Sequence, residues 1–280
     1  MKLLSADTVR RCFVASPGYS ILTADYDQIE LRLAAALSGE SVLIEAAKRG
    51  ESLHKVAATK LFGVDYTPDQ YRYTKNVNFG WLYGGGPKTL SDQAGIPYED
   101  AAKIIKEYQE SFPALTRYKR KLQESVLRSA LSPQEYKAYR ALLQRMWAFR
   151  TDTKDGRKAR AQVGNEIEYL CYHKQGFIMT PTGRRVLVDA RKPYTATNYV
   201  VQSFAADVFK DGLLRVMDDP ELEPTVLLPI HDELLGQAPR RKAEHIAQRY
   251  GEVMSTTFND VPITASGKVY GKSWGHGYRK

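Results

Sequence analysis

The stretch Asp25-Tyr26-Asp27-Gln28-Ile29-Glu30-Leu31-Arg32 decides the fold that we expect for this chain. A short apolar run, Ser20–Ala24, precedes it and predicts a buried strand. The helix-forming run Ile29–Leu37 follows it. Asp25 therefore stands at the carboxyl end of a strand, where a carboxylate can leave the core and meet a metal ion. Glu30 lies one turn into the next element and can face the same pocket; a solvated acidic turn is the alternative.

Composition places the chain among ordinary globular proteins. It has 280 residues, of which 43% are hydrophobic and 26% are charged, enough for one large domain or two smaller ones. The net charge of +9 suggests a polyanionic partner. Cys12 and Cys171 lack metal-binding spacing, so we expect reduced thiols in an intracellular protein. No apolar run approaches the ~18 residues that a membrane span requires.

A second informative stretch is the helix predicted to begin at Pro68, a residue tolerated in a first helical turn. Tyr71, Lys75, Phe79 and Tyr83 follow at intervals of four, so successive side chains are about 40° apart around the helix. One face thus presents a cation followed by two aromatic rings, which suits the phosphates and the sugar and base of a nucleotide. The alternative is a core stripe, which has little use for a lysine in its middle.

The third stretch, Thr225–Leu235, predicts strand, tight turn and strand, with His231-Asp232-Glu233 at the turn. Asp25 and Asp232 then both lie at strand edges of an apolar sheet. We expect both carboxylates to be buried, and buried carboxylates repel one another unless a cation holds them. Oxygen-only ligands suit Mg²⁺.

Together, the three stretches resemble the three polymerase motifs of the family A DNA polymerases (the DNA polymerase I family). The matching strings are D-Y-x-Q-I-E-L-R, K-N-V-N-F-G-W-L-Y-G and H-D-E in an apolar hairpin. The resemblance runs from about Asp7 to the C-terminus and covers palm and fingers only. It implies an α+β fold, with a palm of antiparallel sheet and flanking helices and mostly helical fingers. The expected segments are the first part of the palm at 1–40, fingers at 41–121, a helical and basic insertion at 122–165, and the second part of the palm at 166–280.

The insertion is the part least similar to the family. Ser132-Pro133 predicts the start of an amphipathic helix over Glu135–Phe149, and Thr151–Arg160 is interpreted as a basic loop. A solvated helical decoration is the interpretation that we favour. The alternatives are that the insertion grips DNA or docks another protein.

The resemblance also implies roles for individual residues. Two Mg²⁺ ions about 4 Å apart would be held by Asp25, Asp232 and the main-chain carbonyl of Tyr26, activating the primer 3′-hydroxyl and stabilising the pyrophosphate leaving group. Lys75 would bind the triphosphate and help protonate the departing pyrophosphate, so Asp25, Asp232 and Lys75 are the expected catalytic residues. Glu30 would be a steric gate against the ribose 2′-hydroxyl. The expected nucleotide-binding residues are Gln28, Glu30, His54, Arg72, Lys75, Phe79 and Tyr83. The expected DNA-binding residues are Arg184, Asn198, Gln202, His231 and Glu233.

Two positions depart from the family pattern. Tyr71 stands where relatives usually have an arginine, and we hypothesise that the neighbouring Arg72 supplies the missing γ-phosphate contact. Asp27 stands where many relatives have serine, and the sequence offers no physical reason for the exchange.

The expected function is template-directed DNA synthesis, with primer–template DNA and deoxynucleoside triphosphates as partners. One alternative is a single-subunit RNA polymerase relative, against which Glu30 argues. Another is a non-catalytic DNA-binding subunit, which the joint presence of Asp25, Lys75 and Asp232 disfavours. Because thumb-like and T-G-R-L segments are missing, we expect half of a split polymerase, or a truncated one, with thumb and exonuclease on another polypeptide. The expected location is the cytoplasm of a bacterial or phage-infected cell.

Overall fold

The computed structural model describes residues 6–150 and 152–278, which divide into two compact units. The first unit combines the described residues up to Leu53 with those from Ser203 onward, and the second is His54–Gln202. This division differs from the segment boundaries expected at residues 40, 121 and 165. The naming of the segments as palm, fingers and insertion stays a prediction.

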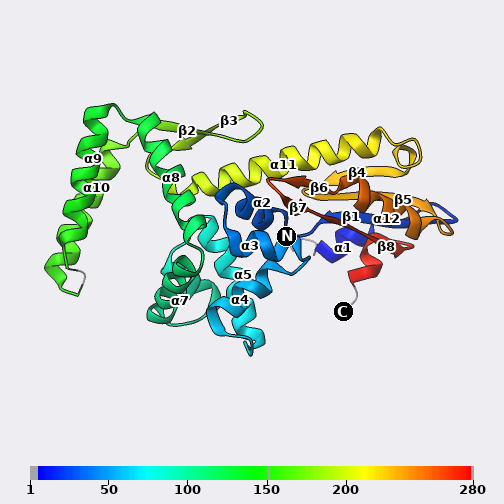
Figure 1. The fold of residues 1–280 in the computed structure, drawn as a ribbon, viewed down its shortest axis with the longest axis horizontal. Helices are drawn as coiled ribbons and strands as arrows, with labels where there is room; N and C mark the ends of the chain where they lie inside the picture. Colours follow the sequence, from blue (N-terminus) through cyan, green and yellow to red (C-terminus); the bar gives the residue numbers. More distant parts are fainter. Residues whose placement is uncertain (1–5, 151, 279–280) are drawn as a thin grey trace. The chain divides into compact units, whose positions relative to one another are not determined.

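The first unit is built on a four-stranded antiparallel sheet with the order β4-β5-β1-β8 (Figure 1). Its central strand β1 (Tyr19–Tyr26) is buried along most of its length. The other strands are β4 (Val226–Ile230), β5 (Glu233–Pro239), β8 (Ala265–Gly271) and the separate hairpin β6 (Thr256–Phe258) and β7 (Val261–Ile263). Its helices are α1 (Ala6–Arg11), α2 (Ile29–Ser38), α3 (Ser41–Lys48), η2 (Glu223–Thr225), α12 (Ala243–Met254), η3 (Trp274–Tyr278) and the part of α11 (Ala196–Met217) from Ser203 onward.

Helix α12 covers one face of this sheet, and two glycines allow its close approach to β8. A Cβ added to Gly267 would lie 1.8 Å from the carbonyl oxygen of Ala247, and one added to Gly251 would lie 2.8 Å from that of Ala265. Separations below 3.0 Å cannot be accommodated against backbone atoms without a shift of the chain. The absence of side chains at these two positions therefore sets the distance between helix and sheet.

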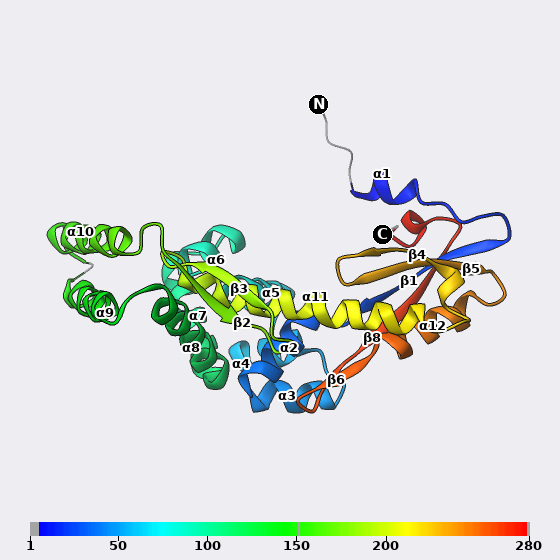
Figure 2. The same ribbon diagram turned by 90° about the horizontal axis from the view of Figure 1, so that it is seen from above.

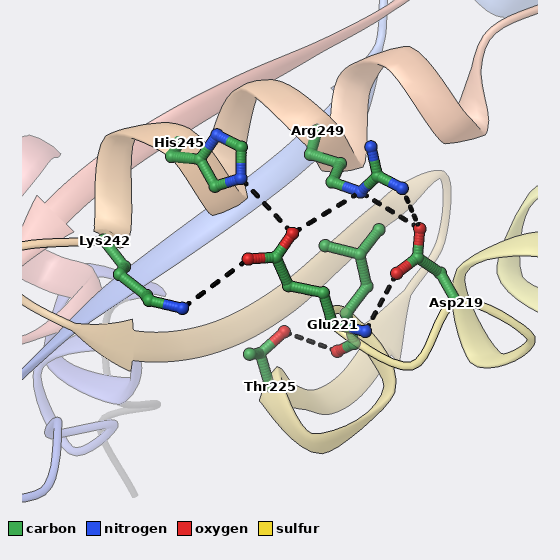
Figure 3. A network of polar contacts seen from close by, with 7 residues as sticks. Asp219, Glu221, Thr225, Lys242, His245 and Arg249 are labelled. Atoms are coloured by element: carbon green, nitrogen blue, oxygen red, sulfur yellow. Dashed lines mark hydrogen bonds and ion pairs between the residues drawn. The ribbon is translucent and has the colours of Figure 1, made fainter.

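Charged side chains tie the segment between α11 and β4 to helix α12 (Figure 3). Arg249 donates through Nε and Nη2 to Oδ2 of Asp219, at 3.0 and 2.6 Å. Glu221 pairs with Lys242 at 3.7 Å and with Nε2 of His245 at 3.3 Å. Because this segment leads into β4, these contacts help to position the β4–β5 turn.

The second unit is mostly helical and has an aromatic core. Trp81, Tyr108 and Phe112 are buried in succession, with ring centroids 5.3 and 4.8 Å apart. Its helices are α4 (Leu53–Phe62, from His54), α5 (Pro68–Leu82), α6 (Pro87–Ala94), α7 (Tyr98–Ser111), α8 (Pro113–Ala130), α9 (Pro133–Ala148), α10 (Lys154–Leu170), η1 (Pro193–Thr195) and the first turns of α11. Its strands are β2 (Gln175–Met179) and β3 (Arg185–Asp189), which form a hairpin.

The insertion forms a helical hairpin in which α9 and α10 lie side by side (Figures 1 and 2). The expected helix after Ser132 is confirmed, with Ser132 and Glu135 forming a reciprocal capping box. The basic loop expected at Thr151–Arg160 is wrong from Lys154 onward, because those residues belong to α10, and Thr151 lies outside the described residues. Thr153 accepts a hydrogen bond from the Gly156 amide at 3.1 Å and caps this helix, and the lysines, arginines and alanines that follow are good helix formers.

Candidate active site

Strands β1 and β5 place carboxylates together at one end of the sheet. Asp25 is the penultimate residue of β1, and its partner in the antiparallel register is Glu233 on β5. Asp232 precedes Glu233 in the two-residue turn from β4, and the Tyr26 amide donates to the Asp232 carbonyl at 3.4 Å. Three acidic residues from two distant parts of the sequence are therefore neighbours.

Two residues beside these carboxylates have backbones in the left-handed region. Gln28, which precedes α2, has φ 53° and ψ 41°, and His231 in the β4–β5 turn has φ 57°. For residues other than glycine, such conformations are unfavourable by roughly 1–3 kcal/mol and persist only where the surrounding structure holds them. Strain of this kind is therefore present at the ends of both carboxylate-bearing strands.

The expectation that both carboxylates are buried is wrong. Asp25 reaches solvent and Asp232 is only half-buried, because both lie where the strands leave the core. Even so, the pKa of Asp25 is raised to about 7, first by partial loss of hydration and then by the negative charges of Asp232, Glu233 and Asp27. A carboxylate this strongly disfavoured as an anion is expected to bind a cation.

The donor atoms at this end of the sheet fit Mg²⁺. Asp25, Asp232 and the main-chain carbonyl of Tyr26 offer only oxygen ligands, and the repulsion around Asp25 is relieved by a divalent cation. Within residues 6–150 and 152–278, no group of three or more His, Cys, Asp or Glu side chains is arranged to hold a metal ion. Mg²⁺ sites commonly use one or two carboxylates and complete their shell with substrate phosphates and water.

The structure gives Asp27 a role that the sequence did not reveal. Its Oδ2 accepts hydrogen bonds from the hydroxyls of Thr264 at 3.1 Å and Ser266 at 2.8 Å. Its main-chain carbonyl accepts from Nε of Arg32 at 2.8 Å. Asp27 thus joins the end of β1 to the start of β8 and to α2, and one carboxylate oxygen accepts both hydroxyl donors.

Glu30 lies in the first turn of α2 and is half-buried. The N-terminal turn of a helix favours a negative charge through its exposed N–H groups. The αL conformation of Gln28 turns the chain from β1 into this helix, so both residues follow the strand that carries Asp25.

Helix α5 presents the expected nucleotide-facing residues on one face. The helix begins with a capping box at Thr67, which confirms its predicted start. The ammonium of Lys75 lies 4.8 Å from the ring centroid of Tyr71, and the rings of Phe79 and Tyr83 are 6.1 Å apart. Lys75 is exposed, whereas Phe79 and Tyr83 are half-buried. A cation and two aromatic rings therefore follow one another along the helix, as the spacing predicts.

His54 of α4 packs against this face. Its ring centroid is 5.2 Å from that of Phe79, and the side-chain amide of Asn78 donates to its Nδ1 at 2.7 Å. Burial, followed by the charge of Lys75, lowers the pKa of His54 to about 4. The His54 ring is therefore neutral near pH 7.

Arg72 is exposed and pairs with Asp69 across one helical turn, at 2.9 Å. Tyr71, in the position where we expected an arginine, stacks on Tyr66 with ring centroids 5.9 Å apart. An exposed ion pair of this kind is weak, so Arg72 can exchange Asp69 for a phosphate at little cost.

The expected DNA-binding residues of the second unit lie on two elements. Arg184 is exposed in the turn between β2 and β3, where its amide donates to the Thr180 hydroxyl at 3.1 Å. Asn198 and Gln202 are one turn apart on α11. The Oδ1 atom of Asn198 is shielded from water and has no hydrogen-bond partner among the described residues.

The predicted site residues fall into two groups, each gathered within one unit. The first unit contains Asp25, Tyr26, Gln28, Glu30, His231, Asp232 and Glu233. The second contains His54, Arg72, Lys75, Phe79, Tyr83, Arg184, Asn198 and Gln202. The first unit has an antiparallel sheet with carboxylates at its edge, and the second has a helix face with a cation and two aromatic rings. This combination is typical of an α+β nucleic-acid polymerase domain.

Comparison with known proteins identifies the family. The family model described as DNA polymerase family A matches residues 2–276, and the chain belongs to this family. It is 34% identical over 273 residues to the DNA polymerase of Mycobacterium phage D29, in an alignment covering 97% of this chain and 37% of that relative. It is 32% identical over 254 residues to a thermostable DNA polymerase I of Thermus thermophilus, covering 89% of this chain and 26% of that one.

A solved structure confirms the α+β fold. The POL domain of Pol1 from M. smegmatis, in complex with DNA primer–template and dNTP, matches the whole chain with a TM-score of 0.72 and 25% identity, over 44% of its own length. The chain thus spans less than half of each of these relatives. Of the helices that the structure describes, none combines the length and apolar character needed to span a membrane.

Proposed function

We propose that this chain catalyses template-directed addition of deoxynucleoside triphosphates to a primer 3′-hydroxyl. The observation that carries the proposal is the cluster of Asp25, Asp232 and Glu233, in which partial loss of hydration, followed by the neighbouring negative charges, raises the pKa of Asp25 to about 7. Membership of DNA polymerase family A, whose members generally use divalent metal ions, and the primer–template and dNTP bound to the M. smegmatis relative support it.

In this proposal Asp25, Asp232 and the Tyr26 carbonyl hold two Mg²⁺ ions, which when bound activate the primer hydroxyl and neutralise the pyrophosphate leaving group. Lys75 binds the triphosphate and donates a proton to the departing pyrophosphate. His54 contacts the triphosphate as a neutral ring. Arg72 contacts the γ-phosphate.

The remaining residues position the substrates. Phe79 packs against the sugar, Tyr83 lies beside the templating base, and Glu30, near Gln28, occupies the space of a ribose 2′-hydroxyl. His231 and Glu233 support the primer terminus, and Arg184, Asn198 and Gln202 contact the primer–template. Amide side chains suit the minor-groove acceptors that every base pair shares.

The relatives are longer than this chain, so the proposal includes a further segment that grips the duplex. It belongs either to a longer form of this chain or to a separate polypeptide, and any exonuclease activity comes from such a segment.

Primer extension tests the proposal. The purified chain is incubated with a labelled primer–template, Mg²⁺ and all four deoxynucleotides, beside Asp232→Ala and the matched control Asp218→Ala, an exposed aspartate outside the site. We expect extension by the wild type and by Asp218→Ala, and none by Asp232→Ala. If the wild type binds the duplex but does not extend it, even with the upstream part of a family member added, the non-catalytic DNA-binding alternative is favoured.

A further inference from the structure

A groove between α8 and α9, in the second unit, has no role in the proposed chemistry. It encloses about 910 Å³. We call it the α8–α9 groove, and it is lined by Arg120, Gln123, Glu124, Leu127, Tyr136, Lys137, Tyr139, Arg140, Ala141, Leu143, Gln144 and Trp147. Within this lining, Tyr136, Arg140, Leu143 and Trp147 recur every three or four positions and form one stripe of α9.

The walls of the groove are positively charged. Arg120, Lys137 and Arg140 are exposed, and none of them forms an ion pair within the described part of the chain. The single acidic residue of the lining is Glu124, which accepts hydrogen bonds from Arg128 at 2.8 Å and from the Tyr136 hydroxyl at 2.7 Å. Its charge is therefore largely balanced, and the groove presents a net positive surface.

Aromatic rings lie between these charges. Tyr136 and Tyr139 are half-buried in the lining, and Trp147 is 64% exposed. The guanidinium of Arg160 on α10 lies 4.5 Å from the Trp147 ring centroid and that of Arg128 lies 4.6 Å from the Tyr136 ring centroid. Cations alternating with aromatic faces are the surface on which proteins bind single-stranded nucleic acids.

The groove continues into a second hollow of about 270 Å³, with which it shares Arg120 and Gln123. That hollow is lined by Gly84, the residue directly after Tyr83 at the end of α5. A Cβ at Gly84 would lie 2.4 Å from the Tyr194 ring, so only glycine leaves room there. Along α8, the linings of the two hollows run from Thr116 to Leu127, about 17 Å of helix.

We propose that the α8–α9 groove binds the single-stranded template ahead of the site of synthesis. That the strand is the template rests on the proposed function, because Tyr83 lies beside the templating base only in that proposal. Unpaired bases can stack on the tyrosine and tryptophan rings, whereas a duplex offers its phosphates and groove edges. The three basic residues contact the phosphates of the same strand.

Equilibrium binding without nucleotides or metal tests this inference. Fluorescence anisotropy is measured with hairpin primer–templates whose 5′ overhang is about two or about 12 nucleotides, within the range of single-strand sites. The variants are Lys137→Ala/Arg140→Ala and Trp147→Ala. The matched control Lys103→Ala/Lys106→Ala removes the same charge from α7, outside the groove. Circular dichroism and melting temperature establish that each variant is folded.

We expect the wild type and the control to bind the long overhang about fivefold or more tightly than the short one. Lys137→Ala/Arg140→Ala should lose this difference and reduce the slope of log K against log salt by about 1.4, as two phosphate contacts on a single strand would. Trp147→Ala should lose affinity for the long overhang with little change in slope, because stacking releases no counterions.

The inference is overturned if the groove variants keep the wild-type preference for the long overhang, or if the control loses it equally. Primer extension on the short overhang reports on the proposed function separately. A chain that fails to extend the primer but shows the expected overhang dependence retains the single-strand groove.

Discussion

Asp25 on β1 and Glu233 on β5 are direct partners in the antiparallel register, although they are separated by more than 200 residues of sequence. The pairing places Asp232 beside Asp25 and concentrates negative charge where two strands leave the core. Partial loss of hydration, followed by this negative charge, raises the pKa of Asp25. A divalent cation should therefore stabilise this chain as well as serve its chemistry.

Magnesium should raise the melting temperature relative to EDTA. At a Mg²⁺ concentration ten times the dissociation constant, the free energy of unfolding should increase by about 1.4 kcal/mol. Differential scanning calorimetry measures the gain, which Asp25→Asn should largely remove because it deletes one ligand and much of the repulsion. An equal shift in wild type and Asp25→Asn would contradict a metal site at this residue. Asp218→Asn is the control for a lost surface charge.

Glu30→Ala should relax discrimination against ribonucleotides, because the side chain is proposed to fill the space of the 2′-hydroxyl. We expect the ratio of kcat/KM for a deoxynucleotide over its ribonucleotide to fall roughly 10- to 200-fold, the range by which a pocket discriminates substrates that differ by one methylene-sized group. Single-nucleotide insertion kinetics measure this ratio. Glu45→Ala, an exposed change on α3, should leave it unchanged. Unaltered sugar selection in Glu30→Ala would refute the gate.

Arg72→Ala should raise the KM for deoxynucleotides by about tenfold or more, because a charged hydrogen bond to phosphate is lost. Asp69→Ala, which removes the partner of Arg72, should not raise it. Lys75→Ala should also lower kcat, since Lys75 is assigned the proton transfer. Steady-state insertion kinetics separate the two constants, and an unchanged KM and kcat in Arg72→Ala would exclude the γ-phosphate contact.

His54 should make unfolding depend on pH. Its pKa is lowered from 6.5 to about 4, so the unfolded chain binds the proton more readily. Its contribution to stability is present above pH 6.5 and is lost as pH falls toward 4, by roughly 2–3 kcal/mol. Asp25 has a raised pKa, so its contribution to stability is lost as pH rises rather than as it falls. Comparison of the wild type with His54→Gln separates the contribution of His54 from that of Asp25. Urea unfolding at pH 7 and pH 4.5 measures the difference, and parallel pH profiles would contradict the assignment.

Gly267→Ala should destabilise the first unit by more than about 2 kcal/mol, because the added Cβ meets the main chain of α12. Gly164→Ala on α10 is the matched control. A Cβ there meets nothing within 4 Å, and replacing a helical glycine gains about 0.5–1 kcal/mol. Urea denaturation compares the two. Similar stabilities for both variants would show that α12 can move away from β8.

Local signals in the sequence predicted much of the fold. Pro68 marks the start of α5, and the four-residue spacing from Tyr71 to Tyr83 places a cation and two rings on one face. These features depend on neighbours within a few turns of helix. The same kind of reasoning failed at Thr151–Arg160, where the density of basic residues outweighed the capping signal of Thr153.

The sequence by itself determined the family, the α+β class and the residues proposed for catalysis, because these are encoded in three short contiguous motifs. Only the tertiary structure decided that Asp25 is exposed yet has a raised pKa, and that Asp27 bonds Thr264 and Ser266. It also decided that α8 and α9 enclose a basic and aromatic groove. The physical reason is that charge repulsion, hydration and hydrogen bonding depend on which residues meet in space. Asp27 and Ser266 are 239 positions apart in the chain.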